Sequence, residues 1–361
     1  MKKIFITAVI LSSAVFVKAQ TGLSKDWFQN VNLSGYVISE YQYSGQDGIT
    51  SHDKFSLRLV RLSLDGKIAK QFYFKIQTQL NGTPGNTSGP RIVDAFLEWQ
   101  KYDFAKIKVG QFKRAFTFEN PIAPIEQGFI GYSTPISKFA GFEDRNNEHS
   151  SNGRDVGIQL QGDFLKNSSG RNLLHYQVAV YNGQGTNATD IDNKKDLIGG
   201  FWAMPIKGLR LGTFGWSGTY ARKDATTKSI TRLDRNRYAF SGEYIKNDWT
   251  FRSEYIHSEG KAFKEESESN TDINEALGDQ ADGWYMSAIA PIKKDICHVK
   301  ARYSCYRPDN TWANSNNQYE VGVDYIFYKK VKAQLNYARV NNRSLVKPNY
   351  DMIDCQVSVS F

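Results

Sequence analysis

Basic side chains alternate with apolar ones in several short segments, which places the two kinds on opposite sides of an extended backbone. Lys106 and Lys108 flank Ile107, for example. The cations that this alternation assigns to a polar face are Arg58, Lys75, Lys106, Lys108, Lys300 and Arg302. Guanidinium and ammonium groups that line a narrow wet passage attract phosphate-like anions, arginine as a two-pronged fork and lysine as a point charge.

Three more cations belong to the candidate set on weaker grounds. Arg61 lies where the apolar phase slips near Val60, as a β-bulge would produce. Lys113 and Arg114 begin a long connection between two predicted strands. Acidic residues lie on the same polar face. The alternative is that they form ion pairs with the cations, which then only keep this face hydrated. Those acids are Asp94, Glu98, Glu254, Glu320, Asp324 and Asp354.

Motifs of catalysis and metal binding are missing. The five histidines are scattered, and the sequence has no H-E-x-x-H, G-x-S-x-G, P-loop or C-x-x-C pattern. Its three cysteines, Cys297, Cys305 and Cys355, fall at apolar strand positions and suit small hydrophobic roles rather than a disulfide framework. We therefore expect no enzyme activity, no cofactor and no metal site.

The elements that would position the cations are short strands. Period-two alternation of apolar and polar residues recurs from residue 31 to the last residue. Val321 and Val323, for instance, oppose Asp324. Sixteen strands are predicted, at 31–43, 54–65, 71–80, 91–101, 104–112, 154–164, 172–182, 196–205, 208–220, 236–246, 248–258, 283–292, 296–306, 318–328, 331–341 and 350–361.

The connections between these strands alternate in length. Short ones, such as 102–103 and 329–330, take turns with long ones, such as 113–153 and 259–282. Outer-membrane barrels have short periplasmic turns, longer extracellular loops and an even number of strands. The pattern therefore predicts an all-β transmembrane antiparallel barrel, with apolar side chains toward lipid and polar ones toward the lumen. Sixteen strands enclose a lumen too wide for side chains to fill.

The N-terminus reads as a secretory signal peptide. Lys2 and Lys3 precede a mostly apolar stretch that is too short to span a membrane, and cleavage is expected after Ala19. The predicted domains are thus a signal peptide, 1–19, and a barrel, 20–361. Removal of Lys2, Lys3 and Lys18 lowers the formal charge from +9 to +6, a modest and unclustered excess that does not favour nucleic-acid binding.

The connection 113–153 is far longer than an ordinary loop, and such loops are usually functional. Its many apolar residues, among them Phe129, Ile136 and Phe139, would be unnecessary in a segment surrounded by water. We expect it to fold into the lumen as the third long loop, with a short helical turn near 126–132. The alternative is an extracellular cap.

Three stretches, 53–66, 109–116 and 153–160, resemble the phosphate-selective porin O and P family. They contain Leu57-Arg58-Leu59-Val60-Arg61-Leu62, Gly110-Gln111-Phe112-Lys113-Arg114 and Gly153-Arg154-Asp155-Val156-Gly157. The resemblance implies a 16-stranded, often trimeric anion channel. It also implies that Arg58, Arg61, Lys113, Arg114 and Arg154 are the best candidates for binding solute. Ala115 stands where the family pattern leads us to expect proline, and the acids of the polar face dilute the positive field.

The sequence therefore predicts a porin of a Gram-negative outer membrane, a water-filled diffusion channel that prefers small anions such as phosphate. Its expected partners are outer-membrane lipids, the anionic solutes, the barrel assembly machinery through a last strand that ends in Phe361, and two further copies in a homotrimer. The alternatives are a non-transporting barrel with an adhesive or structural role and, less favoured, a barrel enzyme.

Overall fold

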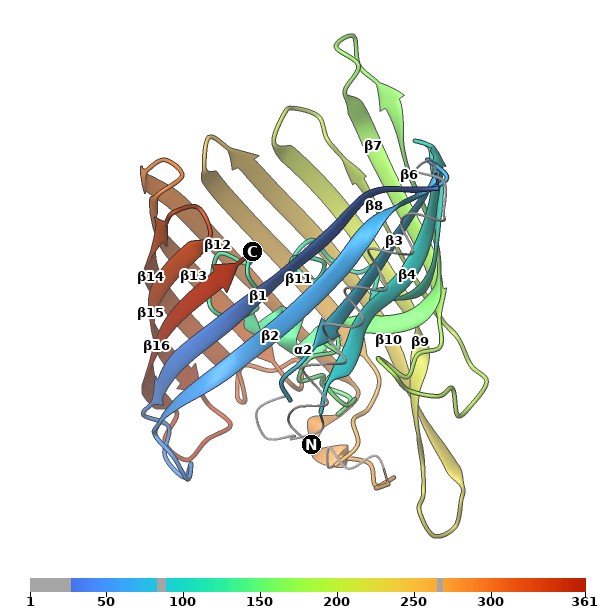
Figure 1. Ribbon diagram of the computed structural model, residues 1–361. Helices are drawn as coiled ribbons and strands as arrows, with labels where there is room; N and C mark the ends of the chain where they lie inside the picture. The colour runs from blue at the N-terminus through green and yellow to red at the C-terminus, as the bar shows by residue number, and fades with distance from the viewer. Residues whose placement is uncertain (1–26, 83–88, 265–268) are drawn as a thin grey trace, which may run out of the picture.

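The computed structural model describes residues 27–82, 89–264 and 269–361, so the expected signal peptide lies outside the described residues. These residues form a closed antiparallel barrel in which each strand pairs with its neighbours in sequence and β1 pairs with β16 (Figure 1). The strands are β1 (Phe28–Ser44), β2 (Asp53–Ile68), β3 (Phe72–Gln79), β4 (Arg91–Tyr102), β5 (Ala105–Lys113), β6 (Arg154–Lys166), β7 (Asn172–Tyr181), β8 (Asp196–Ala203), β9 (Leu209–Lys223), β10 (Ile230–Lys246), β11 (Trp249–Glu259), β12 (Gln280–Lys293), β13 (Cys297–Arg307), β14 (Asn316–Phe327), β15 (Val331–Asn342) and β16 (Asn349–Ser360).

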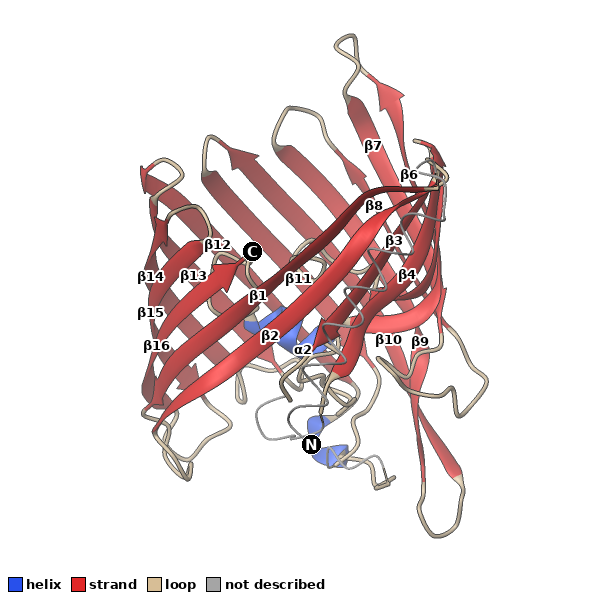
Figure 2. Cartoon of the chain, viewed as in Figure 1, coloured by secondary structure: helices blue, strands red, loops and turns tan. Residues whose placement is uncertain are grey.

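The barrel closes with its first and last strands in register. Tyr36 pairs with Ser360, and the backbone N–H of Phe361 donates to the carbonyl oxygen of Gly35 at 3.0 Å. Closure leaves no sheet edge unpaired, which hydrocarbon requires. Figure 2 shows that strands make up the wall and that the connections gather at its two ends, short at one and long at the other.

The two faces of the wall differ as predicted. Val321, Leu335 and Val357 are about half exposed on the outer surface, at 54%, 47% and 50%. Glu320 and Asp324, at alternate positions on the same strand as Val321, are buried on the lumen side. Hydrocarbon cannot hydrogen-bond polar side chains, so a wall that spans a membrane must face lipid with apolar residues. The arrangement of apolar residues outside and polar residues inside meets this requirement.

Two local predictions need correction. Residues 221–235, expected to be a loop, largely extend β9 and β10 into a hairpin that projects beyond the barrel (Figure 1). Leu59, expected to face lipid, is instead buried at 8% exposure beside Tyr36 and Ile38, because the pairing of β1 with β2 shifts register between Ile38 and Ser39. Arg58 and Arg61 are three positions apart on β2, and in a regular strand such residues point to opposite faces. The bulge adds one residue between them, so both contact the lumen.

The long loop 113–153 folds into the barrel, as the sequence predicted. Its Phe116, Ile136 and Phe139 pack against inward side chains of the wall, including Trp216 and Tyr285. The helix in this loop is α2 (Thr134–Phe139), not the turn predicted near 126–132. Pro135 lies in the first turn of this helix, where proline is favoured because its missing N–H costs nothing.

A second short helix, η1 (Glu275–Leu277), lies in the loop after β11. The cysteines are free and differ in environment: Cys305 is buried, Cys297 is intermediate and Cys355 is exposed. No helix within the described residues has the length and apolar character to cross a membrane.

Candidate functional site

The structure sorts the ten predicted cations into three groups. The first group, Arg58, Lys300 and Arg302, holds the long loop in the lumen. Lys300 Nζ donates to the Gly128 carbonyl oxygen at 2.6 Å, and Arg302 Nη1 donates to the Gly131 carbonyl oxygen at 2.9 Å. Arg58 donates to the neighbouring Ile130 carbonyl oxygen.

These three anchors come from separate parts of the wall, since Arg58 is on β2 whereas Lys300 and Arg302 are on β13, with β1, β16, β15 and β14 between them in the closed barrel. Each also has an acidic partner on the wall: Glu40 for Arg58 at 3.7 Å, Asp324 for Lys300 at 3.6 Å and Glu320 for Arg302 at 2.6 Å. Their charge is therefore largely used in fixing the loop to the inner side of the wall.

The second group surrounds a cavity of about 270 Å³ between the long loop and the wall. Six of the predicted cations line it: Arg61, Lys75, Lys108, Lys113, Arg114 and Arg154. Gln77, Gln159, Gln161 and Gln177 add amide groups, and Pro121 and Ala123 come from the loop. Asp94 is the one carboxylate among these lining residues.

Asp94 serves two of the cations at once. Its Oδ1 lies 2.5 Å from Arg154 Nε, and its Oδ2 lies 3.4 Å from Lys75 Nζ. Lys108 approaches Glu98 at 3.5 Å and lies over the rings of Phe96 and Phe112. One carboxylate cannot neutralise both Arg154 and Lys75, so this side of the cavity retains positive charge.

Arg61 and Lys113 form no ion pair within the part of the chain that the structure describes. Arg61 donates to the Tyr36 hydroxyl at 3.1 Å and to Gln79 Oε1 at 3.2 Å, and only 2% of the residue is exposed. Lys113 Nζ donates to the Tyr132 hydroxyl at 3.2 Å and lies 4.7 Å from the centre of the Phe142 ring. Neutral partners orient both cations but leave their charge uncompensated.

Arg114 also borders the cavity, yet its charge is balanced. The side chain is fully buried, and its Nη2 lies 2.7 Å from Glu148 Oε1 and 2.9 Å from Asp155 Oδ2. Burial alone would raise the pKa of the Glu148 carboxyl, but Arg114 and Arg235 outweigh it and lower that pKa. Arg114 thus ties the loop to the wall rather than offering a free charge.

The third group is Lys106 alone. It approaches Asp163 at 3.9 Å and does not line the cavity. The structure therefore separates Lys106 from its sequence neighbour Lys108, although both lie on the polar face of β5.

Sequence reasoning missed two arginines of the lumen, Arg235 and Arg237 on β10. Arg235 falls between the predicted strands 208–220 and 236–246, and Arg237 is not among the ten predicted cations. Their guanidinium carbons lie 4.7 and 4.8 Å from the centre of the Trp216 ring, and both pair with acids, Arg235 with Asp196 and Arg237 with Asp144. Arg235 and Arg237 are two positions apart, which places them on the same face of a strand, and this spacing is the sequence signal for the pair.

The described residues contain no group of three histidine, cysteine or carboxylate side chains arranged to hold a metal ion. What the lumen presents is a narrowed passage beside the loop, with guanidinium, ammonium and amide groups at its surface. Such groups donate hydrogen bonds to water and to polar solutes in a narrow passage.

Comparison with known proteins agrees with this geometry. A family model described as Gram-negative porin matches residues 6–345. The outer membrane channel DcaP of Acinetobacter baumannii shares 14% identity and a TM-score of 0.62, covering 94% of this chain and 99% of that one. OmpF of Salmonella typhi, in complex with daunomycin, shares 12% identity and a TM-score of 0.63, covering 92% and 97%.

An in-vitro folded OmpT of Vibrio cholerae, described as a trimer form, shares 12% identity and a TM-score of 0.60, covering 92% of this chain and 99% of that one. A search of the curated proteins finds no match. At these identities the solved structures establish the fold, and the family model, which covers nearly the whole sequence, establishes the kinship. The chain belongs to the Gram-negative porin family, and it is an outer-membrane diffusion channel.

Proposed function

We propose that this porin prefers small anions, phosphate among them, and that the cavity beside the long loop is where it selects them. The observation that carries the proposal is the uncompensated charge of Arg61 and Lys113 at that cavity. Asp94, shared between Lys75 and Arg154, adds a further excess of positive charge. The same preference for anions is supported by the resemblance to the phosphate-selective porins in residues 53–66, 109–116 and 153–160.

Low dielectric walls strengthen this preference. Phe96, Phe112 and Pro121 border the cavity together with the cations, so field lines from the charges are less screened there than in open water. A passing anion gains from Arg61 and Lys113, whereas a cation of the same size is repelled. The four lining glutamines supply neutral hydrogen bonds that replace lost hydration for either ion.

The test is the reversal potential of the refolded protein in a planar bilayer under a potassium chloride gradient. We expect a potential of the sign that favours chloride, and we expect the double variant Arg61→Gln/Lys113→Gln to move it toward zero. The control is Lys106→Gln, which removes a single lumen charge outside the cavity and is compared with each of the single variants Arg61→Gln and Lys113→Gln. A wild-type potential that favours potassium would refute the anion preference.

Phosphate selectivity needs a separate measurement. Millimolar inorganic phosphate added to a chloride-conducting channel should reduce the current if the cavity holds phosphate longer than chloride. Arg61→Gln/Lys113→Gln should abolish that block, and Lys106→Gln should retain it. If phosphate leaves the current unchanged while the reversal potential favours chloride, the channel is anion-preferring without being phosphate-selective.

We further propose that the protein assembles as a trimer and is inserted through recognition of the last strand and Phe361. The trimer form of the Vibrio cholerae OmpT neighbour supports the first. The exposed ring of Phe361 at the end of the closing strand supports the second. Chemical cross-linking of the membrane-inserted protein should yield a threefold mass. Absence of any current in bilayers would instead favour an adhesive or structural barrel.

A further inference from the structure

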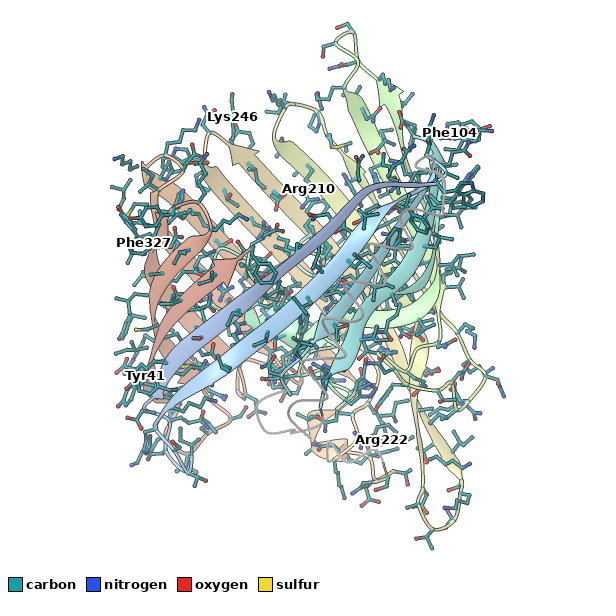
Figure 3. All side chains as sticks on the ribbon, viewed as in Figure 1. Tyr41, Phe104, Arg210, Arg222, Lys246 and Phe327 are labelled. Carbon is teal, nitrogen blue, oxygen red and sulfur yellow. The ribbon has the colours of Figure 1, made fainter. Side chains whose placement is uncertain are left out.

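Every short turn of the barrel bears at least one exposed lysine. The seven turns join β2 to β3, β4 to β5, β6 to β7, β8 to β9, β10 to β11, β12 to β13 and β14 to β15. The exposed lysines in these turns, or within two residues of them, are Lys67, Lys70, Lys101, Lys166, Lys207, Lys246, Lys293, Lys294, Lys329 and Lys330. We call this set the lysine rim; Lys246 marks it in Figure 3.

The rim has few carboxylates to balance it. Those in the same turns are Asp103, Asp248 and Asp295. Asp103 lies 3.7 Å from Lys166, and Asp248 accepts a hydrogen bond from the Asp295 backbone N–H at 2.6 Å. Apart from Lys166, the lysines of the rim have no ion-pair partner among residues 27–82, 89–264 and 269–361.

The long-loop end is different, because several of its exposed lysines have acids beside them. Lys347 pairs with Asp47, Lys195 with Asp190, and Lys261 with Glu275. Among the described residues, exposed lysines without an ion-pair partner are therefore more numerous at the short-turn end than at the long-loop end. Such asymmetry has no role in closing the barrel, whose turns need only residues that tolerate tight backbone geometry.

Exposed apolar residues adjoin the rim lysines in sequence. Leu165, Ile206, Ile245, Ile292 and Tyr328 each immediately precede a lysine of the rim, and each is between 47% and 93% exposed. Phe104, Trp249 and Phe327 are exposed at the same end, and Figure 3 places Phe104 and Phe327 there with Lys246. Aromatic side chains of membrane proteins collect at the headgroup level, where apolar and wet environments meet.

We infer that the lysine rim binds anionic phospholipid headgroups. The reason is that its ammonium groups mostly have no carboxylate partner and lie next to exposed apolar and aromatic side chains. The short turns face the periplasm in barrels of this class, so the lipids are those of the inner leaflet. The apolar residues enter the acyl boundary while the lysine stems extend to place their ammonium groups among the phosphates. A soluble anion would contact only the ammonium groups. The exposed apolar side chains of Leu165, Ile245 and Ile292 favour a ligand that also has an apolar part, as a phospholipid does.

The expected preference for anionic lipid is large enough to measure. A lysine near an anionic surface contributes roughly 1 kcal/mol, which corresponds to about a fivefold preference for an anionic over a zwitterionic neighbour. Because every short turn carries a lysine, the preference would act wherever that end of the barrel contacts lipid. The expected consequence is a shell of anionic lipid that holds the barrel at a fixed depth.

The test reconstitutes the full protein in vesicles that contain brominated lipid, which quenches tryptophan fluorescence on contact. Trp249, one of seven tryptophans, is 43% exposed beside Lys246 and serves as the reporter in a variant in which the other six are replaced by phenylalanine. At equal mole fraction, brominated phosphatidylglycerol should quench more than brominated phosphatidylcholine, with an association ratio of about three to five. The variant Lys246→Gln/Lys293→Gln/Lys294→Gln/Lys329→Gln should bring that ratio close to one.

A matched variant removes the same charge from the other end: Lys54→Gln/Lys194→Gln/Lys223→Gln/Lys228→Gln, all exposed positions at or beside the long loops. It should keep the wild-type ratio. Heat-modified migration in gels confirms that each variant is folded. A wild-type ratio near one, or equal loss in both variants, would overturn the proposal. So would loss of the preference in millimolar inorganic phosphate at constant ionic strength, because it would assign the rim to soluble anions.

Discussion

Asp144 of the long loop and Arg237 of β10 form a two-pronged ion pair, with Oδ1 2.7 Å from Nη2 and Oδ2 2.8 Å from Nη1. Both side chains are fully buried. The same guanidinium group also donates to the Phe139 carbonyl oxygen, at the end of α2. One wall residue therefore holds the helix and the following turn, and with them the narrowing of the lumen.

Removing one member of this pair should loosen the loop. Asp144→Asn leaves Arg237 buried without its partner charge, and breaking buried pairs in this way costs about 3–5 kcal/mol. We expect the barrel to stay closed, since its wall bonds are unaffected, while single-channel current becomes noisier and its mean rises. The control is Glu143→Gln, whose partner Lys138 is at 2.9 Å on the surface, where pairs contribute little. Identical current traces for the two variants would contradict this role of Asp144.

The same pair predicts a response to acid. Burial would raise the pKa of Asp144, but Arg237 outweighs burial and lowers it to about 2. A carboxyl with a folded pKa below its unfolded value of about 3.9 stabilises the fold above that value and loses its contribution as pH falls toward the folded pKa. Current noise should therefore stay constant from pH 7 to about 4 and increase between about 4 and 2. An increase centred near pH 6 would assign the transition to other groups.

Gly35 should be essential for the seam between β1 and β16. A Cβ atom at Gly35 would lie 2.5 Å from the Phe361 ring and 2.6 Å from the Arg61 carbonyl oxygen. Gly35→Ala should therefore push the closing strand away and lower the folded yield and the unfolding temperature. Gly215→Ala, on β9, is the matched control, because a Cβ there meets no atom within 4 Å. Both can be followed by heat-modified gel migration.

The sidedness of the wall can be tested with one charge placed on either face. Val321→Lys puts an ammonium group on the outer face at the middle of β14, where a charge costs about 2–4 kcal/mol in hydrocarbon. Asn336→Lys puts the same group in the lumen beside Glu320, which Asn336 already contacts. Urea titration in vesicles should show a loss of stability for Val321→Lys only. Equal stability of the two would argue against a lipid-facing Val321.

Much of the barrel follows from local sequence. Alternation such as Val321, Val323 and Tyr325 against Glu320 and Asp324 fixes each strand and its two faces, because the side-chain period of a strand is two. The alternation of short and long connections fixes the hairpin order and the even strand number. The inward folding of residues 113–153 also follows from sequence, since its phenylalanines require apolar contacts that water cannot supply.

Pairings between distant segments could not be read from the sequence. Arg61 and Arg154 have the same residue type and similar strand settings, yet one contacts Tyr36 and Gln79 and the other contacts Asp94. The bulge that turns Leu59 inward depends on the register against β1, and α2 forms where Phe139 reaches the wall. Sequence sets which face a residue occupies, whereas only closure of the barrel around its loop decides which charges meet, because charge pairing depends on ångström-scale distances in three dimensions.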